Sequence, residues 1–433
     1  MSGKSEWIDF TAGRNWLAVR KTLRVYRQRW NAMLNIIRRP VPHAVLSWRY
    51  LLPRQSPAVK LHRQVLLRAW PRFPRIVWFL IALCNYSLWY AFFSWRYMYR
   101  ACRRHGATLR KKRGIVQRTQ LVHLFELAWM HGIPPHFYYL YRLYDYPKDN
   151  WLDFIFTHEL PQWHLVMSPK AARHSHAFLR DKQYFSQTLG EAGLPVIETL
   201  ARYRNGQRVD ESVLFQEKSL FLKPRQGSRQ SGCYVLFYYP GEGYALVSTR
   251  VDDDDAGIPR AIHGKAAIVR AVTNLASHCQ YIIQPLVRNH AWLSSYVELD
   301  YAISIRLVTA MIGHVATTVS ATLEIPLPPG FRYVHPMPID IDSGHLSLPL
   351  TISPAPETLD SPAKLAGQTL PAWMEMRRVA EQAHGFCPDI RSVGWDLALG
   401  ERGVIVIEGN FNWVVSEHQL VDNGLIQCFY ETF

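Results

Sequence analysis

Two stretches far apart in the chain carry side chains suited to bind a phosphorylated ligand. Residues 221–232 read FLKPRQGSRQSG, which predicts a strand that delivers Lys223 into a loop containing glycine and serine. Glycine lets backbone N–H groups approach a phosphate closely because no Cβ stands in the way, and Lys223 would neutralise the phosphate charge. In a Walker-type P-loop the lysine follows the glycines and begins a helix. This lysine precedes them, so the pattern excludes a P-loop.

The second stretch supplies oxygen ligands. Residues 393–399 and 404–410 are two largely apolar runs on either side of Gly-Glu-Arg-Gly at 400–403, which predicts a β-hairpin. Cross-strand neighbours on one face of a hairpin lie close together, so Asp396, Glu408 and Asn410 could converge. Magnesium takes such ligands, usually one or two carboxylates plus substrate phosphates. A polar, solvent-facing hairpin is the alternative for this stretch alone, but its combination with the lysine loop favours a site for ATP and Mg²⁺.

Further motifs, in order along the chain, resemble those of ATP-grasp enzymes. Asp181-Lys182, followed by Phe185 and by GLPV at 193–196, is similar to the usual start of that fold. Residues 281–287 (YIIQPLV) resemble the hinge between its two lobes, and residues 304–309 (SIRLVT) resemble the strand whose arginine points at the transferred phosphate. The likeness covers about residues 115–420 and is greatest to the sugar-transfer-associated ATP-grasp family, which is found with cell-surface polysaccharide genes.

The resemblance assigns roles to particular residues. Arg306 and Lys223 would act in catalysis, and Asp396, Glu408 and Asn410 would bind the metal. The nucleotide would be bound by Lys182, Lys223, Gln226, Gly227, Ser228, Ser231, Gly232, Gln284, Pro285, Leu286 and Val287.

Two positions depart from the family pattern. Gln284 replaces a glutamate that contacts the adenine amino group in many members, and a glutamine oxygen can still accept that hydrogen bond. Gly394 stands where some peptide-forming members have an arginine two residues before the first metal aspartate. Either Arg306 takes over that role or the chemistry differs.

The resemblance implies an ATP-dependent carboxylate ligase. A substrate carboxylate would attack the γ-phosphate in line, and an amine or similar nucleophile would open the resulting acyl phosphate. The substrate is expected to be a small molecule or glycan precursor in cell-surface polysaccharide or related biosynthesis, an expectation that rests on family association. Two alternatives are an ATP-grasp kinase that phosphorylates a hydroxyl, and a non-catalytic, membrane-tethered module that senses nucleotide.

The net charge of +16 comes from the N-terminal part of the chain. Residues 1–120 contain 25 Lys and Arg but only two acids, Glu6 and Asp9. Within this region residues 76–95 are uncharged, rich in aromatics and long enough to span a bilayer. Arginines on both sides of this run favour an interfacial or re-entrant helix on anionic lipid over a true span or a buried soluble helix. The uncharged run also argues against nucleic acid as the partner.

These observations predict an α+β, two-lobed ATP-grasp fold preceded by a mainly helical, basic module. Residues 1–114 would associate with an anionic membrane surface, and residues 115–178 would form a helical connector. Residues 179–285 would be the small lobe with the lysine and glycine loop, and residues 286–433 the large lobe with the metal site. The six cysteines show no CxxC spacing and no signal peptide is visible, so the protein is expected on the cytoplasmic face of a membrane.

Local patterns predict three further elements. Residues 233–249 predict a hairpin around PGEG at 240–243. Residues 119–131 predict a helix closed by Gly132, and residues 372–384 predict a helix ended by Gly385.

Overall fold

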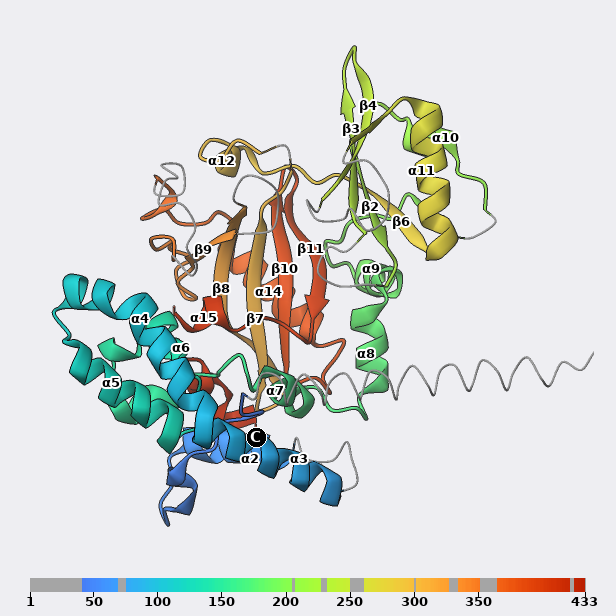
Figure 1. Ribbon diagram of the computed structural model, residues 1–433. Helices are drawn as coiled ribbons and strands as arrows, with labels where there is room; N and C mark the ends of the chain where they lie inside the picture. Colours follow the sequence, from blue (N-terminus) through green and yellow to red (C-terminus); the bar gives the residue numbers. More distant parts are fainter. Residues whose placement is uncertain are drawn as a thin grey trace, which may run out of the picture. The chain divides into compact units, whose positions relative to one another are not determined.

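The computed structural model describes residues 41–68, 75–204, 207–226, 232–249, 261–299, 301–326, 334–350, 364–420 and 424–432. The chain divides into two compact units, Met1–Lys148 and Asp149–Phe433, and most of their helices and strands are labelled in Figure 1. The first unit is helical, and the second combines helices with two antiparallel sheets. This confirms the predicted α+β class, whereas the four predicted segment boundaries stay predictions.

Buried polar contacts join the helices of the first unit. Its elements are η1 (Trp48–Leu51), α2 (Pro57–Arg68), α3 (Arg75–Leu88), the π-helix η2 (Trp89–Phe93), α4 (Ser94–Arg113), α5 (Gln117–Phe125), the π-helix η3 (Glu126–Met130), α6 (His136–Leu140) and η4 (Leu143–Asp145). The buried Trp89 donates its ring N–H to the carbonyl of Ala128 at 3.0 Å. Gln120 of α5 donates its side-chain N–H to the carbonyl of Gly106 of α4 at 3.1 Å. Because Gly106 has no side chain, the two helices can approach closely there.

The predicted helix at 119–131 is present as α5 continued by η3. The uncharged run at 76–95 falls on α3, η2 and the first residues of α4. Among the helices in the described ranges, none combines the length and apolar character needed to cross a bilayer.

A five-stranded sheet carries half of the candidate site. Its strand order is β11-β10-β7-β8-β9, formed by β7 (Ser304–Ile312), β8 (Val315–Pro326), β9 (Val334–Pro338), β10 (Ser392–Gly400) and β11 (Gly403–Asn410). The predicted hairpin is confirmed, because β10 and β11 pair antiparallel down to Gly400 and Gly403 at the turn. The predicted helix is also confirmed as α14 (Trp373–His384), with Gly385 at its C-cap.

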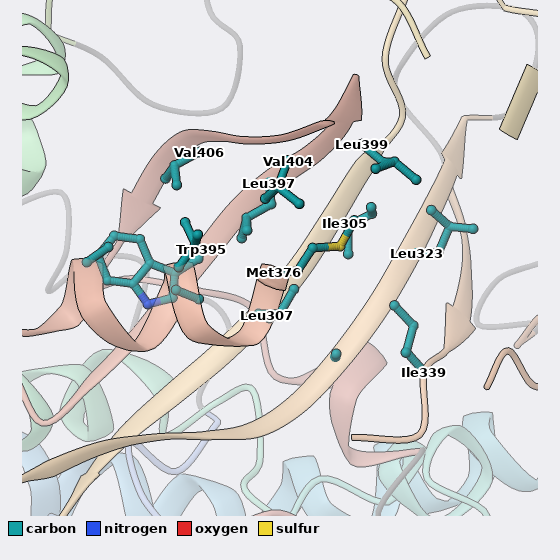
Figure 2. Packing of buried hydrophobic residues seen from close by; sticks show 14 of the residues in the cluster. Ile305, Leu307, Leu323, Ile339, Met376, Trp395, Leu397, Leu399, Val404 and Val406 are labelled. Carbon is teal, nitrogen blue, oxygen red and sulfur yellow. The ribbon is translucent and has the colours of Figure 1, made fainter. Parts of the chain in front are cut away.

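One face of this sheet is apolar and packs against α14. Alternate residues of β7 and β10, including Ile305, Leu307, Trp395 and Leu397, point towards Met376 of the helix (Figure 2). All five side chains are fully buried. The opposite face of β7 and β10 carries Arg306 and Asp396, because successive side chains of a strand point to opposite faces.

A six-stranded sheet carries the other half. Its order is β1-β6-β2-β3-β4-β5, formed by β1 (Ala201–Tyr203), β2 (Leu220–Pro224), β3 (Tyr234–Tyr239), β4 (Gly243–Ser248), β5 (Ala261–His263) and β6 (Tyr281–Pro285). The pairing of β3 with β4 confirms the hairpin predicted at 233–249. Helix α11 (Lys265–His278) contributes Ile268 and Val272 to a core that is separate from that of the five-stranded sheet.

Shorter elements complete the second unit. They are η5 (Lys148–Asp153), α7 (Leu160–Met167), α8 (Arg173–Arg180), α9 (Lys182–Glu191), α10 (Glu211–Leu214), α12 (Ala291–Ser294), α15 (Ser416–Gln419) and η7 (Ile426–Thr432). Helix α9 matters most for the site, because Asp181 caps its N-terminus by accepting hydrogen bonds from the N–H groups of Gln183 and Tyr184.

Candidate functional site

A cavity of about 230 Å³ lies between the two sheets of the second unit. The six-stranded sheet lines it with Phe221, Lys223 and Val235, and the end of β6 and the residues after it add Pro285, Leu286 and Val287. The five-stranded sheet lines it with Ser304, Arg306, Glu324, Asp396, Ile407 and Glu408. The cavity therefore joins segments that are far apart in the sequence, including both stretches singled out above.

One wall is cationic. Lys223 lies on β2, where alternation places it beside Phe221 on the cavity face and places Leu222 in the core. The side chain of Lys182, at the first position of α9, also lines the cavity and lies 3.6 Å from Glu408. Burial lowers the pKa of Lys223 to about 8, and Lys182 adds to this, whereas Glu408 and Cys233 act in the opposite direction. The half-buried Lys182 disfavours the charged form of the buried Lys223, and a bound anion would relieve this.

A carboxylate–guanidinium clamp fixes the position of Lys182. Arg225 follows Lys223-Pro224 in sequence, and its Nε donates to both carboxylate oxygens of Asp181 at 2.8 and 3.0 Å. The N–H of Lys182 donates to the carbonyl of Arg225 at 3.2 Å. Asp181 thus caps α9 and binds the end of β2 at once. Burial acts to raise the pKa of Asp181. The hydrogen bonds that its carboxylate accepts, above all from Arg225, outweigh burial and lower this pKa.

The opposite wall carries the carboxylates. Asp396 of β10 faces Glu408 of β11 across the hairpin, and Asn410 donates its amide to Asp396 at 3.2 Å and to Glu408 at 3.1 Å. Burial raises the pKa of Asp396, with a further contribution from Glu408, against the pull of Arg306. Burial also acts to raise the pKa of Glu408, but Lys182 and Lys223 outweigh it and lower this pKa.

A β-bulge makes this convergence possible. Asp396 pairs with Glu408, but the next residue, Leu397, pairs with Val406, so Ile407 is the extra residue. Without the bulge, strict alternation would put Glu408 on the same face as the buried Val406, in the apolar core. Bulges re-aim side chains in this way beside active sites.

Arg306 lies between two carboxylates on the same face. Its Nε donates to Asp396 at 2.8 Å, and its Nη1 lies 3.0 Å from Glu324 of the neighbouring strand β8. These two contacts fix the position of the guanidinium, which lines the cavity. Glu324 is only 8% exposed, so the pair with Arg306 offsets the cost of burying a carboxylate.

The hinge presents an unpaired acceptor. Gln284 pairs with Phe221 across β6 and β2, so both side chains stand on the face that also carries Lys223. Its side-chain N–H donates to the carbonyl of Ile197 at 3.2 Å. Its side-chain oxygen is buried and, within the described residues, has no hydrogen-bond partner. Such a group favours a ligand that brings a donor. The exocyclic amine of adenine is a donor of this kind.

The acidic wall has the oxygen donors that a divalent cation needs. Across the part of the chain that the structure describes, no three His, Cys, Asp or Glu side chains are grouped to hold a metal. A cation here would therefore be bound by Asp396, Glu408 and the Asn410 amide oxygen, together with oxygens of its substrate. This combination suits Mg²⁺, which seldom has an all-protein cage.

The structure brings most of the predicted site residues together, but not all. Lys182, Lys223, Arg306, Asp396 and Glu408 line one cavity with Pro285, Leu286 and Val287, and Asn410 and Gln284 lie directly behind its walls. Gln226 is exposed and Gly232 is half-buried, and neither lines the cavity. Gly227, Ser228 and Ser231 lie outside the described residues.

Glu324 and Cys233 also line the cavity and were not predicted. For Glu324 a signal exists, because Ser320, Thr322 and Glu324 place a polar side chain at every second position in the second half of β8. That alternation is typical of a strand with one polar face. Nothing in the local sequence marks Cys233.

No protein-family model and no curated protein matches the chain. Among solved structures, it is similar to the ATP-grasp ligase PsnB, with 14% identity over 64% of this chain and 67% of that one and a TM-score of 0.34. It is also similar to N5-carboxyaminoimidazole ribonucleotide synthetase, with 11% identity over 56% of this chain and a TM-score of 0.34. The D-alanine-D-alanine ligase from Coxiella burnetii matches with 11% identity over 55% of this chain and a TM-score of 0.31. The matches span about half of the latter two proteins, 47% and 49% of their lengths.

Proposed function

We propose that residues 149–433 form an ATP-grasp unit that acts as an ATP-dependent ligase. The observation that carries this proposal is the composition of one cavity, in which two lysines from one side face three carboxylates and an arginine from the other. The cationic side matches a triphosphate, and the acidic side matches its metal. The unpaired oxygen of Gln284 beside the hinge matches the adenine amine.

The reaction is the one that the motif resemblance implies, and the charges in the cavity fit it. A substrate carboxylate attacks the γ-phosphorus, the bond to the β,γ-bridging oxygen breaks, and ADP leaves. The acyl phosphate that forms is then attacked at its carbonyl carbon by an amine, which expels inorganic phosphate and loses a proton. Lys182 and Lys223 hold the phosphates in line, and Arg306 lies where it can offset charge on the transferred group.

Asp396, Glu408 and Asn410 would hold Mg²⁺ in this scheme. The ion would supply positive charge to the β- and γ-phosphate oxygens. Arg306 is a second partner of Asp396, so the guanidinium fixes the direction in which that carboxylate points.

The biological setting is part of the proposal. We place the reaction in cell-surface polysaccharide or related biosynthesis, with a small-molecule or glycan-precursor substrate, on the cytoplasmic face of a membrane. The biosynthetic role and the kind of substrate are supported by the resemblance of the motifs at 181–196, 281–287 and 304–309. The membrane setting is supported by the basic residues of the N-terminal region.

The test is substrate-stimulated release of ADP, with hydroxylamine as a trapping nucleophile and a panel of amino acids, uronic acids and hydroxy acids as carboxylates. The ligase predicts a hydroxamate in the presence of ATP and Mg²⁺. Glu408→Gln is expected to abolish it, whereas Glu401→Gln, on the exposed turn of the same hairpin, is expected to retain it.

Other outcomes would redirect the assignment. A stable phosphate ester without hydroxamate would identify a kinase. Binding of ATP without ADP release for any substrate in the panel would favour a nucleotide-sensing module.

A further inference from the structure

The helix pair α3–α4 exposes large apolar side chains to solvent. Residues 75–113 form α3, η2 and α4 without interruption. Leu80 and Leu83 of α3 are 57% and 53% exposed, and Phe92 and Tyr99 further along are 68% and 65% exposed. Soluble proteins rarely leave such a series of large apolar groups uncovered without a binding partner.

Arginines share the face of α4 that carries these aromatics. Exposed side chains recur there at spacings of three and four, with Phe92, Trp95 and Tyr99 alternating with Arg96, Arg100 and Arg103. Within the described residues, none of these three arginines forms a salt bridge. Together with Tyr99 and Arg104, they line one depression on the surface. No Asp or Glu occurs between residues 75 and 113 to oppose their charge.

This combination points to an anionic bilayer. We propose that the face formed by Phe92, Trp95, Arg96, Tyr99, Arg100 and Arg103 docks on a membrane surface containing acidic phospholipid. The aromatic rings would lie at headgroup level, and the guanidinium groups would bind lipid phosphates.

The uncharged side chains decide against nucleic acid. Nucleic acid binds basic groups at its phosphates and aromatic rings by base stacking, but it offers no favourable environment to the exposed aliphatic side chains of Leu80 and Leu83 on the preceding helix α3. A bilayer accepts both kinds of side chain, because long basic groups extend to the interface while apolar ones enter it. The inference rests on the proposed membrane association and is independent of the ligase reaction.

The test is co-sedimentation of the full chain with vesicles of phosphatidylcholine alone or mixed with phosphatidylglycerol. The parent is expected to bind only the mixed vesicles. Replacing Arg96, Arg100 and Arg103 together by glutamine is expected to weaken this binding about 100-fold, since each basic residue near such a surface contributes substantially. Phe92→Asn is expected to weaken it about tenfold and to remove the part of the binding that resists high salt.

A matched control removes the same charge elsewhere. Lys218, Arg208 and Arg270 are exposed in the second unit, and their replacement by glutamine is expected to leave vesicle binding as in the parent. Melting temperatures would show that all variants are folded, and ADP release would report the ligase reaction separately. The proposal is overturned if the Arg96, Arg100 and Arg103 variant binds mixed vesicles as the parent does. It is also overturned if the parent ignores vesicles and binds a homopolymeric RNA through these arginines.

Discussion

The two sheets that wall the cavity neutralise their charges in different ways. The five-stranded sheet pairs its own groups, because Arg306 lies between Asp396 and Glu324 on neighbouring strands. Within the described residues, Lys223 of the six-stranded sheet has no salt bridge, and the nearest favourable charge, Glu408, comes from the other sheet. Arg306 is thus balanced within its own sheet, whereas Lys182 and Lys223 share Glu408 of the opposite wall, which leaves two cations for one carboxylate. We therefore expect substitutions on the acidic wall to reduce the rate and the gain in ATP affinity from Mg²⁺, and those on the cationic wall to reduce nucleotide affinity itself.

The largest expected effect is on the acidic wall. Asp396→Asn is expected to reduce kcat about 1000-fold, because it removes a carboxylate proposed to hold the metal that stabilises the transferred charge. Steady-state turnover at varied Mg²⁺ concentration would measure it. Glu324→Gln is the matched comparison, since it also removes a partner of Arg306 but not a proposed metal ligand. An equal loss in both variants would contradict the metal role of Asp396.

The two sheets should also differ in their response to acid. His384, buried against the five-stranded sheet, hydrogen-bonds Thr309 and the Ile390 carbonyl, and burial lowers its pKa to about 4. The unfolded chain protonates His384 near pH 6.5, whereas the folded chain does so only near pH 4. The stability that comes from the neutral, buried His384 is therefore fully present above about pH 6.5 and is lost as the pH falls towards 4. His384 alone is expected to lower the free energy of unfolding by about 3 kcal/mol over this range.

Urea unfolding at a series of pH values would test this expectation. His384→Gln is expected to reduce the slope of unfolding free energy against pH, whatever its effect on stability at neutral pH. His278→Gln, at an exposed position of α11, is the control and should keep the parental slope. An unchanged slope in His384→Gln would show that the acid sensitivity arises elsewhere.

A smaller effect is expected on the cationic wall. Lys223→Met should weaken ATP binding about 30-fold while the rate at saturation changes less, since a charged hydrogen bond to phosphate contributes about 2 kcal/mol. Lys218→Met, an exposed lysine just before the same strand, should bind ATP as the parent does. Titration calorimetry would measure the ATP affinity of both variants. A loss of kcat in Lys223→Met with unchanged ATP affinity would contradict the assignment of nucleotide affinity to the cationic wall.

The smallest effect should come from the clamp between the end of β2 and α9. Asp181→Asn is expected to weaken ATP binding about tenfold through misplacement of Lys182, because a bidentate charged pair is lost. Arg225→Lys should behave alike, since an ammonium cannot reproduce the fork of the guanidinium. Arg204→Lys on the surface serves as control. Full affinity in both clamp variants would mean that α9 holds Lys182 without this contact.

Local sequence patterns predicted the strands and the turn, but not the irregularity in their pairing. The hairpin turn at 400–403 and the strand ending at Lys223 followed from alternation and glycine placement, and both are present. The bulge at Ile407 could not be predicted, because it depends on which residue of β10 each residue of β11 faces. Glu408 therefore lies on the predicted face of the hairpin because of a bulge that the local sequence does not reveal.

The contacts that fix the cations were also beyond the sequence. Asp181 and Arg225 are separated by 44 positions, and only the folded chain shows that they pair. The same holds for Glu324, whose partner Arg306 lies on the neighbouring strand. Tertiary pairing of this kind leaves no local sequence pattern. The polar face of β8 does leave one, the alternation of polar and apolar residues that ends at Glu324.

The most direct test of a single nucleotide and metal cleft is calorimetric titration of ATP with and without Mg²⁺ into the parent, Lys223→Met, Glu408→Gln and the double variant. We predict one ATP site whose affinity rises with Mg²⁺ in the parent. We also predict that this gain is lost in Glu408→Gln, and that the two single effects are non-additive in the double variant. Equal ATP affinity in all four proteins would contradict the claim that both walls close on one ligand.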